Sequence, residues 1–201
     1  MSAPNAESLD DVPVTPADRL LVEVERLRQE LREANRKIAE LEARADVDPL
    51  LDILNRRGFE RELVRSLAYV RRYGTSAALM FIDLDGFKAV NDRHGHAAGD
   101  ALLKAVAAAL SKNVRASDVV ARLGGDEFGV LMWNLDAARA GAKAAEVESL
   151  IAAVRFEHGG VTLCVGGSAG AVALDPEATA AAIIDAADKA MYVRKRARRG
   201  G

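Results

Sequence analysis

Residues 119–133, VVARLGGDEFGVLMW, place two short β-prone runs on either side of a glycine-rich tetrapeptide. The runs are Val119 to Leu123 and Phe128 to Trp133, and the tetrapeptide between them is Gly124-Gly125-Asp126-Glu127. Because paired glycines allow positive φ in a two-residue turn, this pattern predicts a β-hairpin. A hairpin joins antiparallel strands, so the stretch predicts a sheet that is not purely parallel.

Further strand-like and helical segments surround this hairpin. The apolar run Ala77 to Ile82 is typical of a buried strand, and it leads directly into Asp83. A second strand-like run, broken by glycines, covers Val161 to Leu174. The apolar spacing predicts helices over Phe59 to Tyr73, Ala101 to Lys112, Ala137 to Val154 and Ala180 to Arg198. The expected fold class is α/β, with a mixed central β-sheet that contains a hairpin and is flanked by helices.

The first 46 residues have a different pattern. Residues 1–14 are polar, acidic and interrupted by prolines, which is typical of a disordered leader. Residues 15–46 begin with Thr15-Pro16, a helix start, and continue with an apolar seam at alternating spacings of three and four. The seam consists of Ala17, Leu20, Val24, Leu27, Leu31, Ala34, Ile38, Leu41 and Ala45.

This heptad seam predicts a coiled coil. In a parallel pair Glu23 would face Arg28 and Lys37 would face Glu42, so the flanking charges favour a parallel homodimer. The alternative is one amphipathic helix lying on its own domain. A seam of a and d positions alone is narrower than such a helix normally carries.

Composition excludes several classes of protein. The chain has 201 residues, and 28 Lys+Arg against 30 Asp+Glu give no reason to expect a partner among nucleic acids or membranes. The one cysteine, Cys164, excludes a disulfide framework and is expected to be a small buried hydrophobe. No apolar run approaches the roughly 18 residues of a membrane span, and the N-terminus lacks a secretory signal. A cytoplasmic location is therefore expected.

Carboxylates stand where the predicted strands end. In residues 81–88, FIDLDGFK, the strand runs into Asp83 and Asp85. Two carboxylates about 4 Å apart repel by roughly 4 kcal/mol at an effective dielectric near 20, and a divalent cation removes that repulsion. Asp126 and Glu127 at the hairpin tip would supply further oxygen ligands. The alternatives are a turn with solvated aspartates and an ordinary exposed hairpin.

From about Asp46 to Arg199, the chain resembles the GGDEF family of diguanylate cyclases, and the matching pieces occur in the same order as in that family. The matching pieces are Asp48-Pro49-Leu50, Leu54-Asn55-Arg56-Arg57-Gly58-Phe59, Asp83-Leu84-Asp85-Gly86-Phe87-Lys88, Asn91-Asp92, Gly95-His96-Ala97-Ala98-Gly99-Asp100, Arg122 to Phe128, and Ala187 to Tyr192 with Lys195 and Arg199. The chain departs from the family pattern where Leu50-Leu51-Asp52 replaces the usual Leu-Thr-Gly. This departure affects the hinge between the coiled coil and the domain more than the active site. The resemblance implies a nucleotide-cyclase fold like a polymerase palm.

The resemblance also implies a role for each matching residue. Asp83, Asp126 and the backbone carbonyl of Leu84 would hold Mg²⁺, or Mn²⁺ in its place. Catalysis would rest on Asp126 and on Glu127, which would take part in activating the ribose 3′-hydroxyl; which residue is the general base stays open. Asn91 and Asp100 would bind guanine with His96 nearby, and the triphosphate would be held by Lys88, Lys195 and Arg199.

Arg115 and Asp118 form an R-x-x-D tetrapeptide that begins nine residues before Gly124. In the resembling family this spacing marks an inhibitory site for the product. The alternative is an exposed ion pair that contributes less than about 1 kcal/mol.

The sequence therefore predicts a homodimeric, Mg²⁺-dependent diguanylate cyclase that condenses two GTP into cyclic di-GMP and two pyrophosphates and is inhibited by its product. The alternative is a catalytically silent GGDEF-like module that binds cyclic di-GMP or GTP as a dimeric scaffold. The predicted domains are the leader 1–14, the dimerisation helix 15–46 and the catalytic domain 47–201. No receiver, PAS or membrane sensor is expected in the leader, so both constitutive activity and an unknown regulatory partner on the N-terminal segment stay open.

Overall fold

The computed structural model describes residues 16–199, except the side chains of Asp18, of residues 38–44 and of Arg199. The chain divides into two units between Arg44 and Ala45. The predicted leader 1–14 and the predicted cap Thr15 lie outside the described residues.

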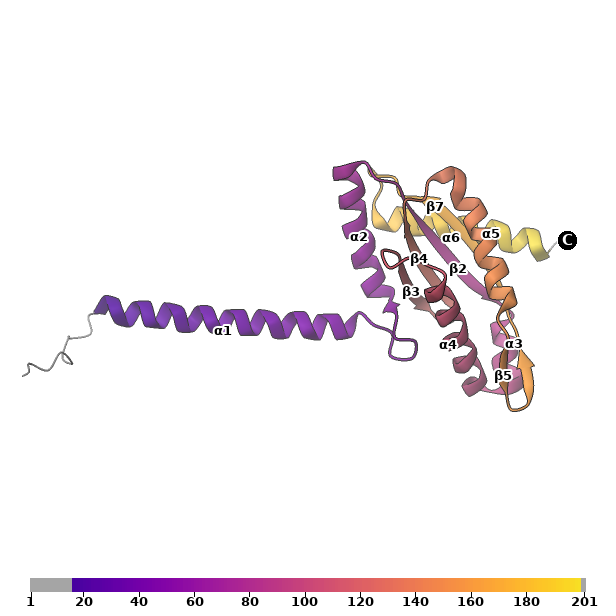
Figure 1. The fold of residues 1–201 in the computed structure, drawn as a ribbon, viewed down its shortest axis with the longest axis horizontal. Helices are drawn as coiled ribbons and strands as arrows, with labels where there is room; N and C mark the ends of the chain where they lie inside the picture. The colour runs from indigo at the N-terminus through magenta and orange to yellow at the C-terminus, as the bar shows by residue number, and fades with distance from the viewer. Residues whose placement is uncertain (1–15, 200–201) are drawn as a thin grey trace, which may run out of the picture. The chain divides into compact units, whose positions relative to one another are not determined.

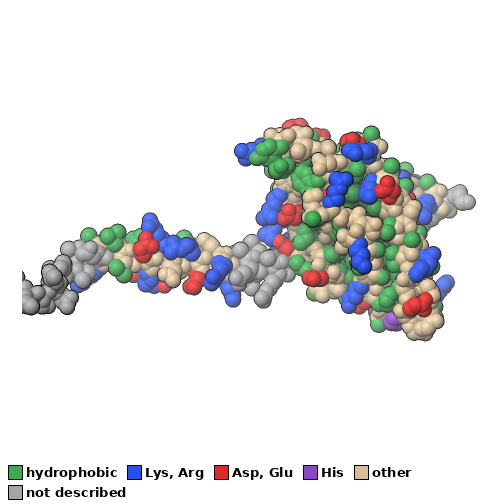
Figure 2. All heavy atoms as spheres, viewed as in Figure 1, with side chains coloured by type: hydrophobic (Ala, Val, Ile, Leu, Met, Phe, Trp, Pro, Cys, Tyr) green, Lys and Arg blue, Asp and Glu red, His purple; other side chains and the backbone are tan. Residues whose placement is uncertain are grey.

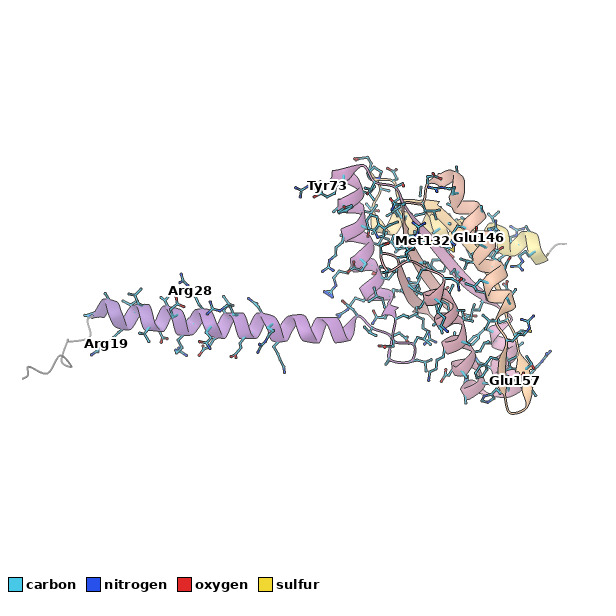
Figure 3. All side chains as sticks on the ribbon, in the orientation of Figure 1. Arg19, Arg28, Tyr73, Met132, Glu146 and Glu157 are labelled. Carbon is cyan, nitrogen blue, oxygen red and sulfur yellow. The ribbon has the colours of Figure 1, made fainter. Side chains whose placement is uncertain are left out.

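The first unit contains one long helix, α1, Pro16–Ala45. Its charged side chains pair along the helix: Arg26 bonds to Glu23 and Glu30, and Arg28, which is labelled in Figure 3, bonds to Glu25. Such pairs contribute about 0.2–0.5 kcal/mol each. The described seam residues are exposed, among them Leu20 at 65%, Leu27 at 50% and Leu31 at 62%. The helix is as predicted, whereas its pairing with a second copy stays a prediction.

The second unit is built on a five-stranded sheet in the order β1-β3-β4-β2-β7, flanked by helices (Figure 1). The strands are β1 Leu54–Asn55, β2 Ala77–Asp85, β3 Val119–Gly124, β4 Glu127–Trp133 and β7 Gly166–Ala173. The pair β1/β3 is parallel and the other three pairs are antiparallel. The predicted mixed sheet is confirmed, and β3 and β4 form the predicted hairpin.

The described part of the second unit has five helices, of which four were predicted from the sequence. They are α2 Arg56–Tyr73, α3 Phe87–His94, α4 His96–Lys112, α5 Ala137–Ala153 and α6 Ala180–Arg199. Helix α3 was not predicted because it spans only two turns between Gly86 and Gly95, both at positive φ. The run expected over Val161 to Leu174 is two strands, β7 and β6, Val161–Leu163, of which β6 forms a separate hairpin with β5, Phe156–His158.

Alternation along β2 assigns its side chains to two cores. Met80, Ile82 and Leu84 pack with residues of α3, α4 and α5. Leu79 and Phe81 pack with residues of α2 and α6 on the other face. Because successive side chains of a strand point to opposite faces, Asp83 and Asp85 continue the α2/α6 face.

Cys164 is exposed, so the prediction of a buried cysteine is wrong. Its neighbours Leu163 and Val165 take the inward positions, which leaves Cys164 pointing outward between β6 and β7. Within residues 16–199 no helix combines the length and the apolarity that crossing a membrane requires. Figure 2 shows side chains of both charges mixed with apolar ones on the visible face of the second unit.

Two glycines of β7 allow helices to approach the sheet closely from opposite faces. A Cβ at Gly167 would lie 2.8 Å from Ile151 of α5, and one at Gly170 would lie 1.9 Å from the backbone nitrogen of Met191 in α6. The second contact is with backbone, which has no rotamer to change. Any side chain at Gly170 must therefore push α6 away from the sheet.

We expect Gly170→Ala to lower the free energy of unfolding by more than about 2 kcal/mol, because the added methyl group overlaps the α6 backbone. Gly141 in α5 is the matched control, since a Cβ there meets nothing within 4 Å. Gly141→Ala should raise stability by about 0.5–1 kcal/mol through helix propensity. Urea unfolding followed by circular dichroism measures both, and equal effects of the two variants would contradict this account of the α6 contact.

Candidate active site

The end of β2 and the tip of the β3–β4 hairpin lie side by side. Asp83 is opposite Glu127 of β4 and Ser168 of β7 in the antiparallel register. The backbone N–H of Leu84 donates to the carbonyl oxygen of Asp126 at 3.2 Å. The two-residue loop of the hairpin has φ of 45° at Gly125, a conformation that favours glycine. The pairing of β2 with β4 thus brings three carboxylates, Asp83, Asp126 and Glu127, together where β2 ends and β4 begins.

The surroundings of Asp126 and Glu127 disfavour the charged forms of these two carboxylates. Burial raises the pKa of Asp126; a hydrogen bond from its own backbone N–H acts in the opposite direction, and the carboxylate of Asp83 raises the pKa further. Burial also raises the pKa of Glu127, against the effect of Arg56, while Asp83 and Asp126 add to the increase. A cation placed among them would relieve this repulsion.

Lys195 of α6 places a positive charge beside the carboxylates at the end of β2. Its ammonium forms an ion pair with Asp83 and lies 4.0 Å from Asp85 Oδ1. The side chains of Lys195 and Asp83 are each only 17% exposed. The structure thus brings together four of the residues singled out from the sequence, Asp83, Asp126, Glu127 and Lys195.

The residues expected to bind guanine lie on α3 and α4. Asn91 of α3 is half-buried, and a Cβ at Gly99 of α4 would lie 1.9 Å from its Oδ1, so the glycine makes room for this amide. Lys88, His96 and Asp100 are exposed. Among the described side chains, no hydrogen bond or ion pair joins these three to the carboxylates at the end of β2. The side chain of Arg199, expected at the triphosphate, lies outside the described part.

Two arginines that were not predicted to have a role, Arg56 and Arg122, form hydrogen bonds to the backbone of the β3–β4 hairpin. Arg56 donates from Nε to the carbonyl oxygen of Leu123 at 2.7 Å and lies 3.4 Å from Glu127 Oε2. Arg122 donates from Nε and a terminal nitrogen to the carbonyl oxygen of Gly125, at 3.0 and 2.8 Å. Arg56 and Arg122 both lie in segments that match the GGDEF family, Leu54–Phe59 and Arg122–Phe128. Their place in these segments was the only sign in the sequence that they contribute to the site.

Arg122 also connects the hairpin to the loop that opens the second unit. Its NH1 lies 3.3 Å from Asp48 Oδ2, and Asp48 Oδ1 accepts hydrogen bonds from the backbone N–H groups of Leu50 and Leu51. Asp52, where the resembling family has glycine, takes a φ of 56°. Aspartate tolerates this left-handed conformation better than most residues, so the loop closes despite the substitution.

The predicted product site has a different geometry from an Arg–Asp ion pair. Asp118 Oδ2 accepts from the backbone N–H of Arg115 at 2.9 Å, and Oδ1 accepts from the backbone N–H of Trp133 at 3.0 Å. The guanidinium of Arg115 is exposed and borders a cleft of about 420 Å³ that Arg139 and Lys143 of α5 also line. Asp118 therefore holds the turn, and Arg115 remains available to a ligand.

Comparison with known proteins identifies the family of the chain. The family described as "Diguanylate cyclase, GGDEF domain" matches residues 45–201. The chain belongs to the GGDEF family. It is 40% identical over 188 residues to diguanylate cyclase TpbB of Pseudomonas aeruginosa, covering 90% of this chain and 41% of TpbB. It is also 40% identical to the probable diguanylate cyclase DgcE of Escherichia coli, covering 86% of this chain and 16% of DgcE. The chain thus spans less than half the length of either relative.

A solved structure of the family shares the fold. The coiled coil and GGDEF domain of DgcB from Caulobacter crescentus, in complex with c-di-GMP, aligns with a TM-score of 0.69 and 27% identity. The alignment covers 89% of this chain and 92% of that chain. The mixed sheet with flanking helices is therefore the fold of GGDEF domains.

Proposed function

We propose that this protein is a Mg²⁺-dependent diguanylate cyclase that converts two GTP into cyclic di-GMP and two pyrophosphates as a homodimer. The observation that carries the proposal is the convergence of Asp83, Asp126, Glu127 and Lys195 at one edge of the sheet. Membership of the GGDEF family supports the same activity.

The donor set at this edge fits a hard divalent cation. Mg²⁺ is bound in such sites by one or two carboxylates together with substrate phosphates, and Asp83, Asp126 and the Leu84 carbonyl would supply the protein oxygens. Within residues 16–199 no group of three His, Cys, Asp or Glu side chains is arranged to hold a metal ion. Phosphate oxygens of the substrate would complete the coordination. When bound, Mg²⁺ or Mn²⁺ would stabilise negative charge on the reacting phosphates.

The chain's own residues would bind and orient GTP. Lys88, Lys195 and Arg199 would neutralise the triphosphate, while Asn91 and Asp100, with His96 nearby, would accept and donate hydrogen bonds at guanine. A site that hydrogen-bonds guanine rejects adenine strongly, because its polar groups would be left unpaired.

The reaction needs a proton acceptor and in-line geometry. The 3′-oxygen of one GTP forms a bond to the α-phosphorus of the other while the bond from that phosphorus to the β-phosphate oxygen breaks, and pyrophosphate leaves. The proton of the 3′-hydroxyl would pass to a general base, and Glu127, next to the proposed metal ligand Asp126, would take part in this activation. The second attack, with the two nucleotides exchanging roles, closes the ring.

The homodimer follows from the requirement for two GTP molecules. Each domain would bind one, so two sites must face each other. A parallel coiled coil of α1 would raise the effective concentration of the second domain to about the millimolar range of short linkers. The aligned structure of DgcB from Caulobacter crescentus likewise combines a coiled coil with a GGDEF domain.

Incubation of the purified protein with GTP and Mg²⁺ tests the activity, with cyclic di-GMP and pyrophosphate measured together. Formation of both in a ratio of one to two is the expected result. Binding of GTP or cyclic di-GMP without turnover would instead favour the silent scaffold.

Asp126→Ala should abolish turnover and leave the fold intact, because the carboxylate at the hairpin tip makes little packing contact. Asp83→Asn should behave alike and weaken the dependence on Mn²⁺ or Mg²⁺. Glu177→Ala, whose side chain is 81% exposed, is the control. Initial rates and thermal unfolding measure these effects; retention of a tenth of the wild-type rate by Asp126→Ala would remove Asp126 from the site.

Leu27→Asp combined with Leu31→Asp should give monomers at micromolar concentration, because it places charges at adjacent positions of the apolar seam. Specific activity should then rise steeply with protein concentration. Light scattering and initial rates over a dilution series measure this. Activity that is independent of concentration in a monomeric variant would show that α1 does not deliver the second domain.

Arg115→Ala should relieve inhibition by added cyclic di-GMP and leave the initial rate within a few-fold, since Arg115 lies outside the proposed GTP contacts. A guanidinium offers a planar pair of donors to a phosphate or a guanine edge. Initial rates against cyclic di-GMP concentration compare the variant with the wild type. Superimposable curves would mean that this turn is only structural.

A further inference from the structure

The buried face of α6 changes from apolar to cationic along its length. Ile183, Ala187 and Met191 are buried at intervals of four residues. Three, four and seven residues after Met191, the same face carries cations, which have carboxylate partners on two other elements, β2 and α5. The cations are Arg194, Lys195 and Arg198, and the carboxylates are Asp83, Asp85 and Glu148.

Glu148 of α5 forms the best-aligned pair of this group. Its Oε1 accepts from Arg194 Nε at 3.0 Å and its Oε2 accepts from Arg194 NH2 at 2.7 Å, a two-point contact. The Glu148 side chain is 11% exposed, against 36% for Arg194. Burial opposes ionisation of Glu148, but the hydrogen bonds of Arg194 and of the Ala169 N–H outweigh it, and the pKa is lowered.

This pair closes the edge of the sheet. Strand β7 is the last strand of the sheet, with α5 on one face and α6 on the other. Glu148 Oε1 accepts from the β7 backbone N–H of Ala169 at 3.0 Å, and Arg198 donates to the carbonyl oxygen of Gly167. Edge groups of a sheet otherwise lack a partner, so these side chains join both helices to the same strand.

The position of Lys195 depends on this junction. Lys195 follows Arg194 directly, and its ammonium reaches Asp83 across the α2/α6 face. Upstream, the contact of Met191 with Gly170 prevents α6 from moving toward the sheet, but it does not prevent movement away. The Glu148–Arg194 pair restrains movement in that direction one turn further along the helix, together with the bond of Arg198 to Gly167.

We infer that Glu148 and Arg194 are positioning residues of the nucleotide site, which hold the end of α6 so that Lys195 meets the triphosphate. The inference rests on the proposed function. Neither side chain touches the carboxylates of the proposed metal site, and both act through Lys195. A purely structural ion pair would change stability alone.

A double-mutant cycle separates the two roles. The variants are Arg194→Ala, Lys195→Ala and both together, and the measurement is the Kd for 3′-deoxy-GTP with Mg²⁺, a nucleotide that lacks the attacking hydroxyl. We expect Arg194→Ala to raise the Kd about tenfold in the wild-type background and less than twofold in the Lys195→Ala background. Equal factors in both backgrounds would overturn the inference.

Further variants guard against loss of folding. Glu148→Gln keeps an acceptor for the Ala169 N–H but loses the charge, and it should raise the KM for GTP with little change in kcat. Arg194→Lys keeps the charge without the planar fork and should fall between Arg194→Ala and the wild type. Glu146→Gln removes an exposed partner of Lys143 on the same helix (labelled in Figure 3) and should leave the Kd unchanged.

The outcomes also distinguish this inference from the proposed function. A wild type that binds 3′-deoxy-GTP but makes no cyclic di-GMP would refute the cyclase activity, and the cycle would still decide the role of Arg194. A wild type that does not bind the nucleotide would overturn both. An unchanged Kd in Glu148→Gln and Arg194→Ala, with lowered unfolding temperatures, would show a structural pair only.

Discussion

The alternation of side chains along β2 determines which groups meet at the proposed active site, where β2 ends beside the β3–β4 hairpin. Asp83 lies opposite Glu127 in the antiparallel register, so both project from the face that α2 and α6 cover. That face provides Arg56 to Glu127 and Lys195 to Asp83. A shift of β4 by one residue against β2 would turn Glu127 to the opposite face, toward the apolar cluster that α4 and α5 line. The same pairing that buries the core therefore assembles the site.

The second constraint is that an edge strand must have its polar groups satisfied while two helices approach it closely. Gly167 and Gly170 remove the side chains that would separate β7 from α5 and α6. Glu148 and Arg198 then bond to backbone groups of the buried residues Ala169 and Gly167 of β7. Because these partners are charged, they also orient the cationic end of α6. Stability of the edge and placement of Lys195 thus depend on the same contacts.

Features set by local sequence could be predicted, and contacts between distant segments could not. The hairpin followed from paired glycines between apolar runs, and the burial of β2 followed from residues 77–82. Helix α3 was missed because two turns between glycines give too short a periodic signal. The bonds of Arg56 to Leu123 and of Arg194 to Glu148 join residues 67 and 46 positions apart, and no spacing along the chain announces them. Residues singled out by family resemblance converged only in part, since α3 and α4 carry Lys88, His96 and Asp100 without a described contact to Asp83.

The exposed seam of α1 and the charges beside it contribute on different scales. Full burial of a leucine or valine stabilises by about 1.5–3 kcal/mol, whereas an ion pair on a helix surface contributes about 0.2–0.5 kcal/mol. Arg28 already pairs with Glu25 within one helix, so a pair with Glu23 of a second copy would replace a bond rather than add one. Association of α1 would thus be driven by residues such as Leu27 and Leu31, and the flanking charges would select the parallel direction. A parallel pair with two-fold symmetry presents identical faces of two domains to each other, which is the relation that two reciprocal attacks require.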